Sequence, residues 1–329
     1  MRWAKRIAAL GMAVLCVYWL MSAGAFSGVG QRLFKLLTQC GASVEAMAPS
    51  ASSPAVSKAP DDDAQAPVPS ASPVPSKAER AVATTISGGL NVKNGTKYEI
   101  PVSELLKAGP SIKLQAGKPQ ILIIHTHSSE AYSPAGLDKY EDSDTNRTED
   151  KRYSVVRVGD ELTAIFEKAG LEVIHDREIH DYPSYTGSYS RTGEAIEGYL
   201  KKYPSIKIVI DLHRDALGAG DVVYKTMAEE DGVCASQIMM LVGTDESGLE
   251  HPKWRENLKL ALYLQDAVST AYPTLMRPVE VVPQRYNQQL TTGSMILEVG
   301  SSGNTLQEAL AAVRLYGKAA APALAKLVE

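Results

Sequence analysis

The stretch Ile121-Leu122-Ile123-Ile124-His125-Thr126-His127-Ser128-Ser129-Glu130-Ala131-Tyr132 decides how the rest of the chain is interpreted. Its first four residues are apolar and follow Lys118-Pro119, a pattern typical of a strand that is buried on both faces. His125, His127 and Glu130 come directly after these apolar residues. Open α/β sheets bind ligands at the carboxyl ends of their strands. The stretch therefore favours a metal site over a solvated loop that happens to hold two histidines.

The spacing of these polar residues leaves open which of them bind a metal. His125 and His127 are two positions apart, so both would point to one face if the strand continued. His127 and Glu130 are three apart, which suits a strand that turns sharply. We therefore interpret His127 and Glu130 as ligands, and His125 either as a ligand or as a buried strand histidine beside the site.

From Lys118 onward, apolar runs alternate with amphipathic segments. This alternation predicts a three-layer α/β/α sandwich with a mostly parallel or mixed sheet. The predicted strands are 121–125, 171–174, 206–212, 238–242, 279–282 and 294–299. The predicted helices are 154–168, 192–202, 253–271 and 305–327.

The N-terminal region reads as a membrane anchor. Residues 1–6 carry Arg2, Lys5 and Arg6, and residues 7–26 are a run of twenty without a charge. Such a run is long enough to cross a bilayer as a helix, and longer than the apolar part of most signal peptides. Because the basic flank stays in the cytoplasm, we expect a single-pass cell-membrane protein with its remainder outside the cytoplasm. Ala23-Gly24-Ala25 also fits a cleavage site, so removal of the segment stays an alternative.

Three segments connect the anchor to the α/β region. Residues 27–47 read as a juxtamembrane segment, and 48–85, crowded with Pro, Ala and Ser, as a disordered tether. Residues 86–118 are a lead-in with an Asn94-Gly95 hairpin signal and a short helix starting near Pro101. We assign the catalytic domain to 119–329.

Composition excludes some classes of function. The net charge is −4, and no basic run is long enough to indicate binding to nucleic acid. The three cysteines, Cys16, Cys40 and Cys234, contain no C-x-x-C pair. Their spacing therefore predicts neither a disulfide framework nor a cysteine zinc site.

Two further strands end in residues that bind metals or transfer protons. The strand 206–212 runs into His213, and the strand 294–299 carries Glu298 near its end. A hydrolytic zinc site usually has three protein ligands and keeps a position for water. His127, Glu130 and His213 supply such a set, and a separate carboxylate is needed to transfer the proton. We therefore predict a Zn²⁺ site with Glu298 as catalytic base and acid.

Neighbouring polar residues receive secondary roles. Asp211 or Asp215 is expected to orient an imidazole. Arg214 is expected to hold a substrate carboxylate or an oxyanion, and Asn287 to touch substrate. His175, His180 and His251 are interpreted as loop histidines outside the site, and Cys234 as structural or incidental.

Several motifs together resemble a known family. An H-x-x-E motif with a distant His and a late Glu is also found in zinc carboxypeptidases, but the wider sequence is more similar to the stage II sporulation protein P family of spore-forming Firmicutes. The matching motifs are His125–Tyr132, Tyr153–Gly159, Asp211–Asp215, Tyr286–Gln288 and Leu297–Gly300. They extend from about residue 119 to the end of the chain.

The resemblance implies a zinc-dependent, amidase-like hydrolase of peptidoglycan. Members are related to N-acetylmuramoyl-L-alanine amidases, and cut the amide between glycan and stem peptide, and also peptide cross-links, during engulfment of the forespore. The implied location is the sporulation septum and engulfing membrane, and the implied partners are stage II sporulation proteins D and M. The usual first amidase motif, Asp-Pro-Gly-His-Gly-Gly, is absent, so the choice among His125, His127 and Glu130 stays open. The alternatives are a wall-binding scaffold without activity and a carboxypeptidase acting on wall peptides.

Overall fold

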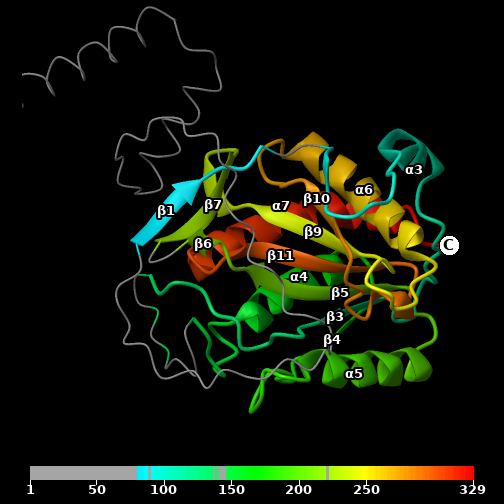
Figure 1. The fold of residues 1–329 in the computed structure, drawn as a ribbon, viewed down its shortest axis with the longest axis horizontal. Coiled ribbons are helices and arrows are strands. Elements are labelled where there is room, and N and C mark those ends of the chain that lie inside the picture. The colour runs from blue at the N-terminus through cyan, green and yellow to red at the C-terminus, as the bar shows by residue number, and fades with distance from the viewer. Residues whose placement is uncertain (1–79, 88–89, 136–137, 139, 141–145, 220–221) are drawn as a thin grey trace, which may run out of the picture. The chain divides into compact units, whose positions relative to one another are not determined.

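A seven-stranded sheet forms the centre of the described part of the chain (Figure 1). The computed structural model describes residues 80–329, apart from 88–89, 136–137, 139, 141–145 and 220–221. The strands of this sheet are β2 (Val92–Asn94), β3 (Ile121–Ile124), β4 (Val173–His175), β5 (Ile208–Asp215), β9 (Ile238–Gly243), β10 (Val279–Val282) and β11 (Ser294–Ser301). Their spatial order is β2-β10-β9-β11-β5-β3-β4, and every neighbouring pair is parallel except β9 and β11.

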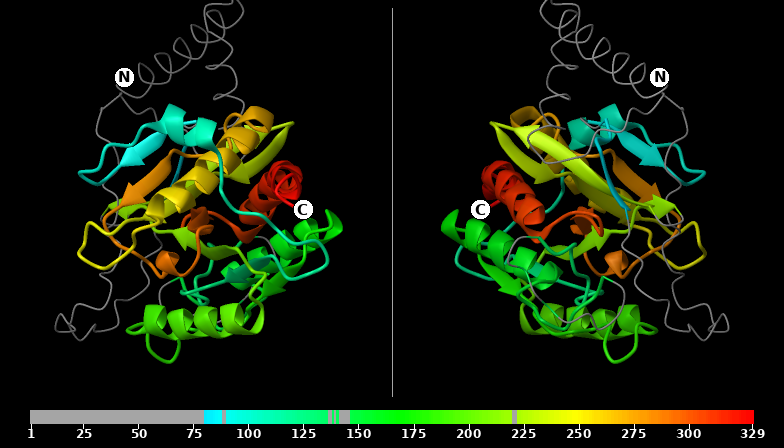
Figure 2. Two further views of the ribbon diagram at one scale, coloured as in Figure 1. Left: turned by 90° about the vertical axis from the view of Figure 1, so that its right-hand side faces the viewer. Right: turned by 90° about the vertical axis from the view of Figure 1, so that its left-hand side faces the viewer.

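Helices cover both faces of this mixed sheet, so the predicted three-layer α/β/α sandwich is confirmed. The helices are α3 (Val102–Ala108), α4 (Val155–Lys168), α5 (Ser188–Lys202), α6 (Trp254–Ala271) and α7 (Leu306–Ala325). The largest core cluster joins α4, α6 and α7 to one face of the sheet, and a smaller one joins α5 to the other face. Figure 2 shows α5 set apart from the other long helices.

The alternation of side chains along β5 places the polar residues on the α5 face. Ile210 and Leu212 pack in the core with α4 and α7, whereas Val209 packs with α5. Because side chains alternate along a strand, Asp211 and His213 follow Val209 onto the α5 face. The strands β3, β5 and β11 are parallel, so their carboxyl ends, which carry the candidate ligands and Glu298, meet at one edge of the sheet.

Local capping defines where two helices begin. Ser154 precedes α4, and its hydroxyl accepts a hydrogen bond from the backbone N–H of Val156. Thr305 and Glu308 form a capping box at the start of α7. Such caps contribute about 0.5–2 kcal/mol each to stability. The predicted starts of both helices are confirmed to within a residue, whereas α5 begins four residues before its predicted start.

A second, smaller sheet was not predicted. It contains β1 (Arg80–Thr84), β6 (Gly218–Ala219), β7 (Val222–Glu230) and β8 (Val233–Ser236). β1 pairs in parallel with β7, more than 130 positions along the chain. The assignment of residues 80–84 to the disordered tether is therefore wrong, because a distant partner strand supplies the hydrogen bonds that this short, alanine-rich segment lacks locally.

One other local prediction is wrong. Asn94-Gly95 does not close a hairpin, because β2 pairs with β10 and the Gly95 N–H donates to the carbonyl of Val281 at 2.8 Å. Cys234 is disulfide-bonded, which fits the structural role that was one of its two interpretations. The short helix predicted after Pro101 is confirmed as α3.

The predicted anchor at 7–26, the juxtamembrane segment at 27–47 and the tether up to residue 79 lie outside the described residues. Among the helices of the described ranges, none combines the length and apolar character needed to cross a membrane.

Candidate metal and active site

The turn after β3 carries two of the candidate ligands. β3 ends at Ile124, and residues 126–129 form a turn that brings Glu130 into a short antiparallel bridge with Arg147. The carbonyl of Glu130 accepts a hydrogen bond from the N–H of Val155 at 2.9 Å, which ties the turn to the start of α4. Because the strand does not continue, His125 and His127 do not share a face.

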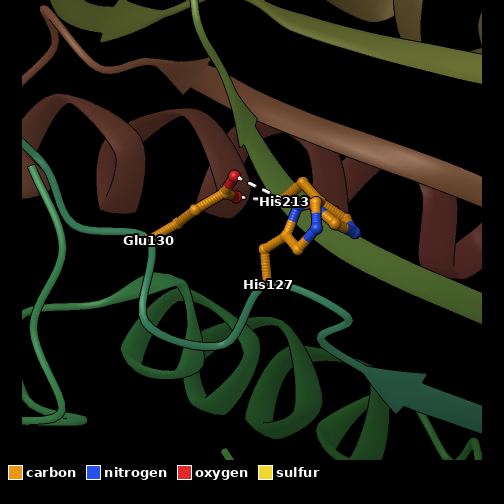
Figure 3. A group of neighbouring side chains, drawn as sticks. All are labelled: His127, Glu130 and His213. Carbon is orange, nitrogen blue, oxygen red and sulfur yellow. Dashed lines mark ion pairs between the residues drawn. The ribbon is translucent and has the colours of Figure 1, made fainter. Parts of the chain in front are cut away.

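His127, Glu130 and His213 form one buried group (Figure 3). One ligand atom from each lies within 4.8 Å of the other two. Nδ1 of His127 is 3.5 Å from Glu130 Oε1, and Nδ1 of His213 is 3.4 Å from Glu130 Oε2. The side chains that we proposed as ligands from the sequence are therefore brought together.

Asp211 and two backbone groups hold this arrangement in place. Asp211 Oδ1 is 2.9 Å from Nε2 of His213, on the ring edge that faces away from Glu130. The N–H and hydroxyl of Thr126 donate to the two oxygens of Asp211 at 2.8 and 2.6 Å. The backbone N–H of Arg214 donates to Glu130 Oε2 at 3.1 Å. Each carboxylate is thus oriented by hydrogen bonds from the neighbouring strand end.

The charges in the group are strongly coupled. Burial alone would raise the pKa of Glu130, but His127 and His213 outweigh it and hold that pKa well below its usual value. Burial alone would lower the pKa of His213, but Asp211 and Glu130 outweigh it and raise that pKa well above the usual value. Without a metal, His213 therefore carries a proton and is a cation between two carboxylates. A bound metal ion would replace the positive charge of this proton.

Glu298 stands next to His213 on the neighbouring strand. The two residues are register partners in the parallel pairing of β11 and β5. Glu298 is partly buried, and its Oε2 has no hydrogen-bond partner in the part of the chain that the structure describes. Burial raises the pKa of Glu298 to about 8, and repulsion from Asp215 adds to this effect. A carboxyl group with such a pKa is suited to both accept and return a proton near neutral pH.

Two residues expected at the site bind elsewhere. Asp215 forms an ion pair with Arg277 at 2.7 Å instead of orienting an imidazole. The buried guanidinium of Arg214 donates to the carbonyls of Ala131 and Asn146 at 2.7 and 2.8 Å, so it holds backbone instead of facing substrate. Nearness to His213 in the sequence does not fix the direction of a side chain: Asp211, the other candidate, is the aspartate that faces an imidazole, and Arg214 contacts backbone.

Asn287 also has a structural contact. It adopts a left-handed backbone with φ of 57°, and its amide donates to the carbonyl of Tyr189 at 2.7 Å. The preceding Tyr286 is left-handed as well, with φ of 51°. Two successive non-glycine residues in this conformation are strained, and such strain concentrates near functional sites. Asn287 therefore fixes the start of α5 beside the metal group.

His125 lies outside the metal group. It is fully buried on the α4 side of the sheet, with Nδ1 2.8 Å from the carbonyl of Leu212 and Nε2 2.8 Å from Nε2 of His175. The structure therefore favours the second interpretation of His125, a buried histidine beside the site. His175 and His180 are likewise hydrogen-bonded within the fold, to His125 and Asp176, and are not solvated loop residues.

This placement of His125 makes a direct prediction. His125→Ala leaves the carbonyl of Leu212 and Nε2 of His175 without their partner, which we expect to lower the free energy of unfolding by about 1–3 kcal/mol. The metal content of the folded protein should stay unchanged. Denaturant unfolding and elemental analysis measure the two quantities. Loss of metal from a variant of normal stability would return His125 to the ligand set.

Sequence reasoning missed three residues that contact the group. Arg147 Nη2 lies 3.6 Å from Glu130 Oε1, and the ring of Tyr185 stacks on His127. Asp181 bonds to the turn through Ser129. All three come from segments without strand or helix periodicity. The only signal for Asp181 and Tyr185 is the density of Tyr and Asp between His175 and Tyr189, and Arg147 has none.

The chain is also similar to solved amidase structures. An N-acetylmuramoyl-L-alanine amidase from Clostridium difficile 630 is 13% identical, with a TM-score of 0.38 over 64% of this chain and 97% of that one. The N-acetylmuramoyl-L-alanine amidase AmiC2 of Nostoc punctiforme is 12% identical, with a TM-score of 0.36 over 64% of this chain and 99% of that one. Similarity at this level says nothing about activity.

Sequence comparison identifies the family. Stage II sporulation protein P of Bacillus subtilis (strain 168) is 26% identical over 217 residues, which are 63% of this chain and 51% of that protein. The chain thus spans about half the length of this curated relative. The sequence model of stage II sporulation protein P matches residues 38–321, which is most of the chain. The chain therefore belongs to the stage II sporulation protein P family.

Proposed function

We propose that this protein is a zinc-dependent peptidoglycan hydrolase that acts in sporulation. Its reaction is cleavage of the amide between N-acetylmuramic acid and the L-alanine of the stem peptide, with peptide cross-links as further substrates, during engulfment. The observation that carries the proposal is the buried group of His127, Glu130 and His213 with Glu298 beside it. Membership of the stage II sporulation protein P family supports the substrate.

The residues present fit a zinc ion. Two imidazoles and one carboxylate are a common ligand set for catalytic zinc, and no cysteine contributes to this group. Nδ1 of His127 and Nδ1 of His213 face the two oxygens of Glu130 at 3.5 and 3.4 Å, so the donor atoms of the three side chains converge. When bound, zinc would supply a Lewis acid that polarises the scissile carbonyl and makes water more acidic.

The protein's own residues would divide the remaining work. Asp211 holds His213 in one orientation through its 2.9 Å contact, and the N–H of Arg214 holds Glu130. Glu298 would take the proton from the attacking water and return it to the amide nitrogen. An amide nitrogen leaves poorly unless it is protonated, so one group that acts as base and then acid serves both steps. The raised pKa of Glu298 supports this assignment.

Digestion of purified peptidoglycan, followed by mass analysis, tests the reaction. An amidase releases stem peptides with a free L-alanine amine and leaves the glycan strands intact. Cleavage of cross-links instead yields shorter peptides still joined to sugar, and a carboxypeptidase removes only the terminal residue. Peptidoglycan left unchanged by zinc-loaded protein would rule out an enzyme and favour a wall-binding scaffold.

We further propose that residues 7–26 anchor the protein in the cell membrane, with the tether at 48–79 and the catalytic domain at 119–329 outside the cytoplasm. The uncharged run after a basic flank supports this topology. Protease added to intact protoplasts should digest the C-terminal region, with a cytoplasmic protein as the protected control. Protection of the C-terminal region would reverse the topology.

Family membership also supports stage II sporulation proteins D and M as partners, at the septal and engulfing membrane. Co-purification from sporulating cells after crosslinking tests this. Recovery of the protein without either partner would count against the assembly.

A further inference from the structure

The two histidines of the metal group are held in different ways. The ring of His213 has a carboxylate behind it, Asp211, at 2.9 Å from Nε2. A carboxylate or carbonyl in this position is the usual device that fixes the rotation of a ligand imidazole. Neither buried Nε2 makes a well-aligned hydrogen bond within the described ranges, but that of His127 also lacks the nearby carboxylate that His213 has. The contact of Nδ1 with Glu130 is therefore the polar contact of this ring, and its outer edge needs another kind of support.

Aromatic rings enclose His127 instead. Tyr185 stacks on it, with ring centroids 4.5 Å apart and an angle of 24° between the planes. Tyr189 and His213 meet the same imidazole edge-on, with centroids 5.6 and 5.0 Å away. Rotation of the imidazole about its bond to Cβ would drive the ring into Tyr185. Aromatic pairs of this kind contribute about 0.5–1.5 kcal/mol beyond the area they bury.

Arg147 and Asp181 connect Tyr185 to the turn that carries the ligands. The guanidinium of Arg147 lies over the Tyr185 ring, 5.0 Å from its centroid, and pairs with Asp181 Oδ2 at 2.5 Å. Asp181 accepts hydrogen bonds from the N–H and the hydroxyl of Ser129 at 3.0 and 2.6 Å. Since Ser129 lies between His127 and Glu130 in the sequence, these contacts join the tyrosine loop to the ligand-bearing turn.

We propose that Tyr185 is a positioning residue for the metal centre. Its ring fixes the orientation of the His127 imidazole, as the Asp211 carboxylate fixes that of His213. The inference rests on the proposed metal site. Tyr185 is 39% exposed and His127 only 6%, so the tyrosine is an outer layer over a buried imidazole. The stack fixes the plane of the ring before metal binds, and it keeps water from that face.

Zinc affinity of the full-length protein in detergent tests this role, measured by competition with a chelator at one pH. Tyr185→Leu removes the stacked ring, and we expect it to weaken zinc binding about 10–100-fold, as loss of other groups that orient ligands does. Tyr185→Phe keeps the ring and should bind zinc within about twofold of the unmodified protein. Tyr182→Leu is the matched control, because Tyr182 lies on the same loop, is 50% exposed and should leave affinity unchanged.

The outcomes separate positioning from folding and from catalysis. The unfolding midpoints of the zinc-free variants report on the fold, and Tyr185→Phe should rescue affinity whatever the stability of Tyr185→Leu. Equal affinity of Tyr185→Leu and the unmodified protein would overturn the inference, as would an equal loss in Tyr185→Phe or in Tyr182→Leu. No substrate is present, so a protein that binds zinc but cleaves nothing would fail the proposed reaction and leave this inference intact. An unmodified protein that binds no zinc would overturn both.

Discussion

His213→Ala is expected to abolish both zinc binding and peptidoglycan cleavage. The substitution removes one of the three proposed ligands and also the cationic ring that lies between the buried carboxylates of Glu130 and Asp211. Breaking a buried ion pair in this way destabilises a protein by about 3–5 kcal/mol. We therefore expect no zinc after dialysis, no released stem peptides and a lower unfolding midpoint.

His251→Ala is a matched control for this experiment. His251 is also fully buried, and its ring contacts Asn257 at 3.2 Å, outside the metal group. Its loss should lower stability while zinc content, measured by elemental analysis of the folded fraction, stays at one per chain. An active, zinc-free His213→Ala protein would end the metal hypothesis, whereas loss of zinc from both variants would attribute the effect to the fold.

Six of the seven strands of the central sheet, all but β2, could be predicted because their signals are local. The apolar run of β3, Ile121–Ile124, and the alternation of helices and strands after it need no knowledge of the partner strands. β1 and β7 depend on each other across more than 130 positions, and neither has a periodicity that identifies it alone. The smaller sheet was therefore missed because its strands pair across a long distance in the sequence.

The residues of the candidate site also divide into those with a local sequence signal and those without one. His127, Glu130 and His213 could be predicted as a group because each was expected just after a buried strand, and parallel strands end at one edge of the sheet. The role of His125 could not be settled, since it depends on the residue at which β3 stops. Tyr185 belongs to a loop whose path no pattern predicts, so its contact with His127 needed the structure.

Glu298→Gln is expected to retain zinc while turnover falls by at least ~100-fold, the usual contribution of a positioned acid–base group. The amide keeps the shape of the side chain but cannot accept the proton from water or return it to the leaving nitrogen. It should also fold normally. The pKa of Glu298 is raised from 4.5 to about 8, so ionisation increasingly destabilises the zinc-free protein as pH rises toward that value, and a neutral glutamine avoids this loss.

Three measurements decide the role of Glu298: zinc content, release of stem peptides from purified peptidoglycan, and unfolding of the zinc-free protein at pH 6 and pH 9. Glu280→Gln is the matched control, because Glu280 is a buried glutamate on β10 whose partner is Lys93, and it should keep the full rate. Loss of zinc from a normally folded Glu298→Gln protein would make Glu298 a ligand. Retention of both zinc and rate would place the base elsewhere, and Asp211, the remaining carboxylate in contact with His213, would then be the residue to substitute.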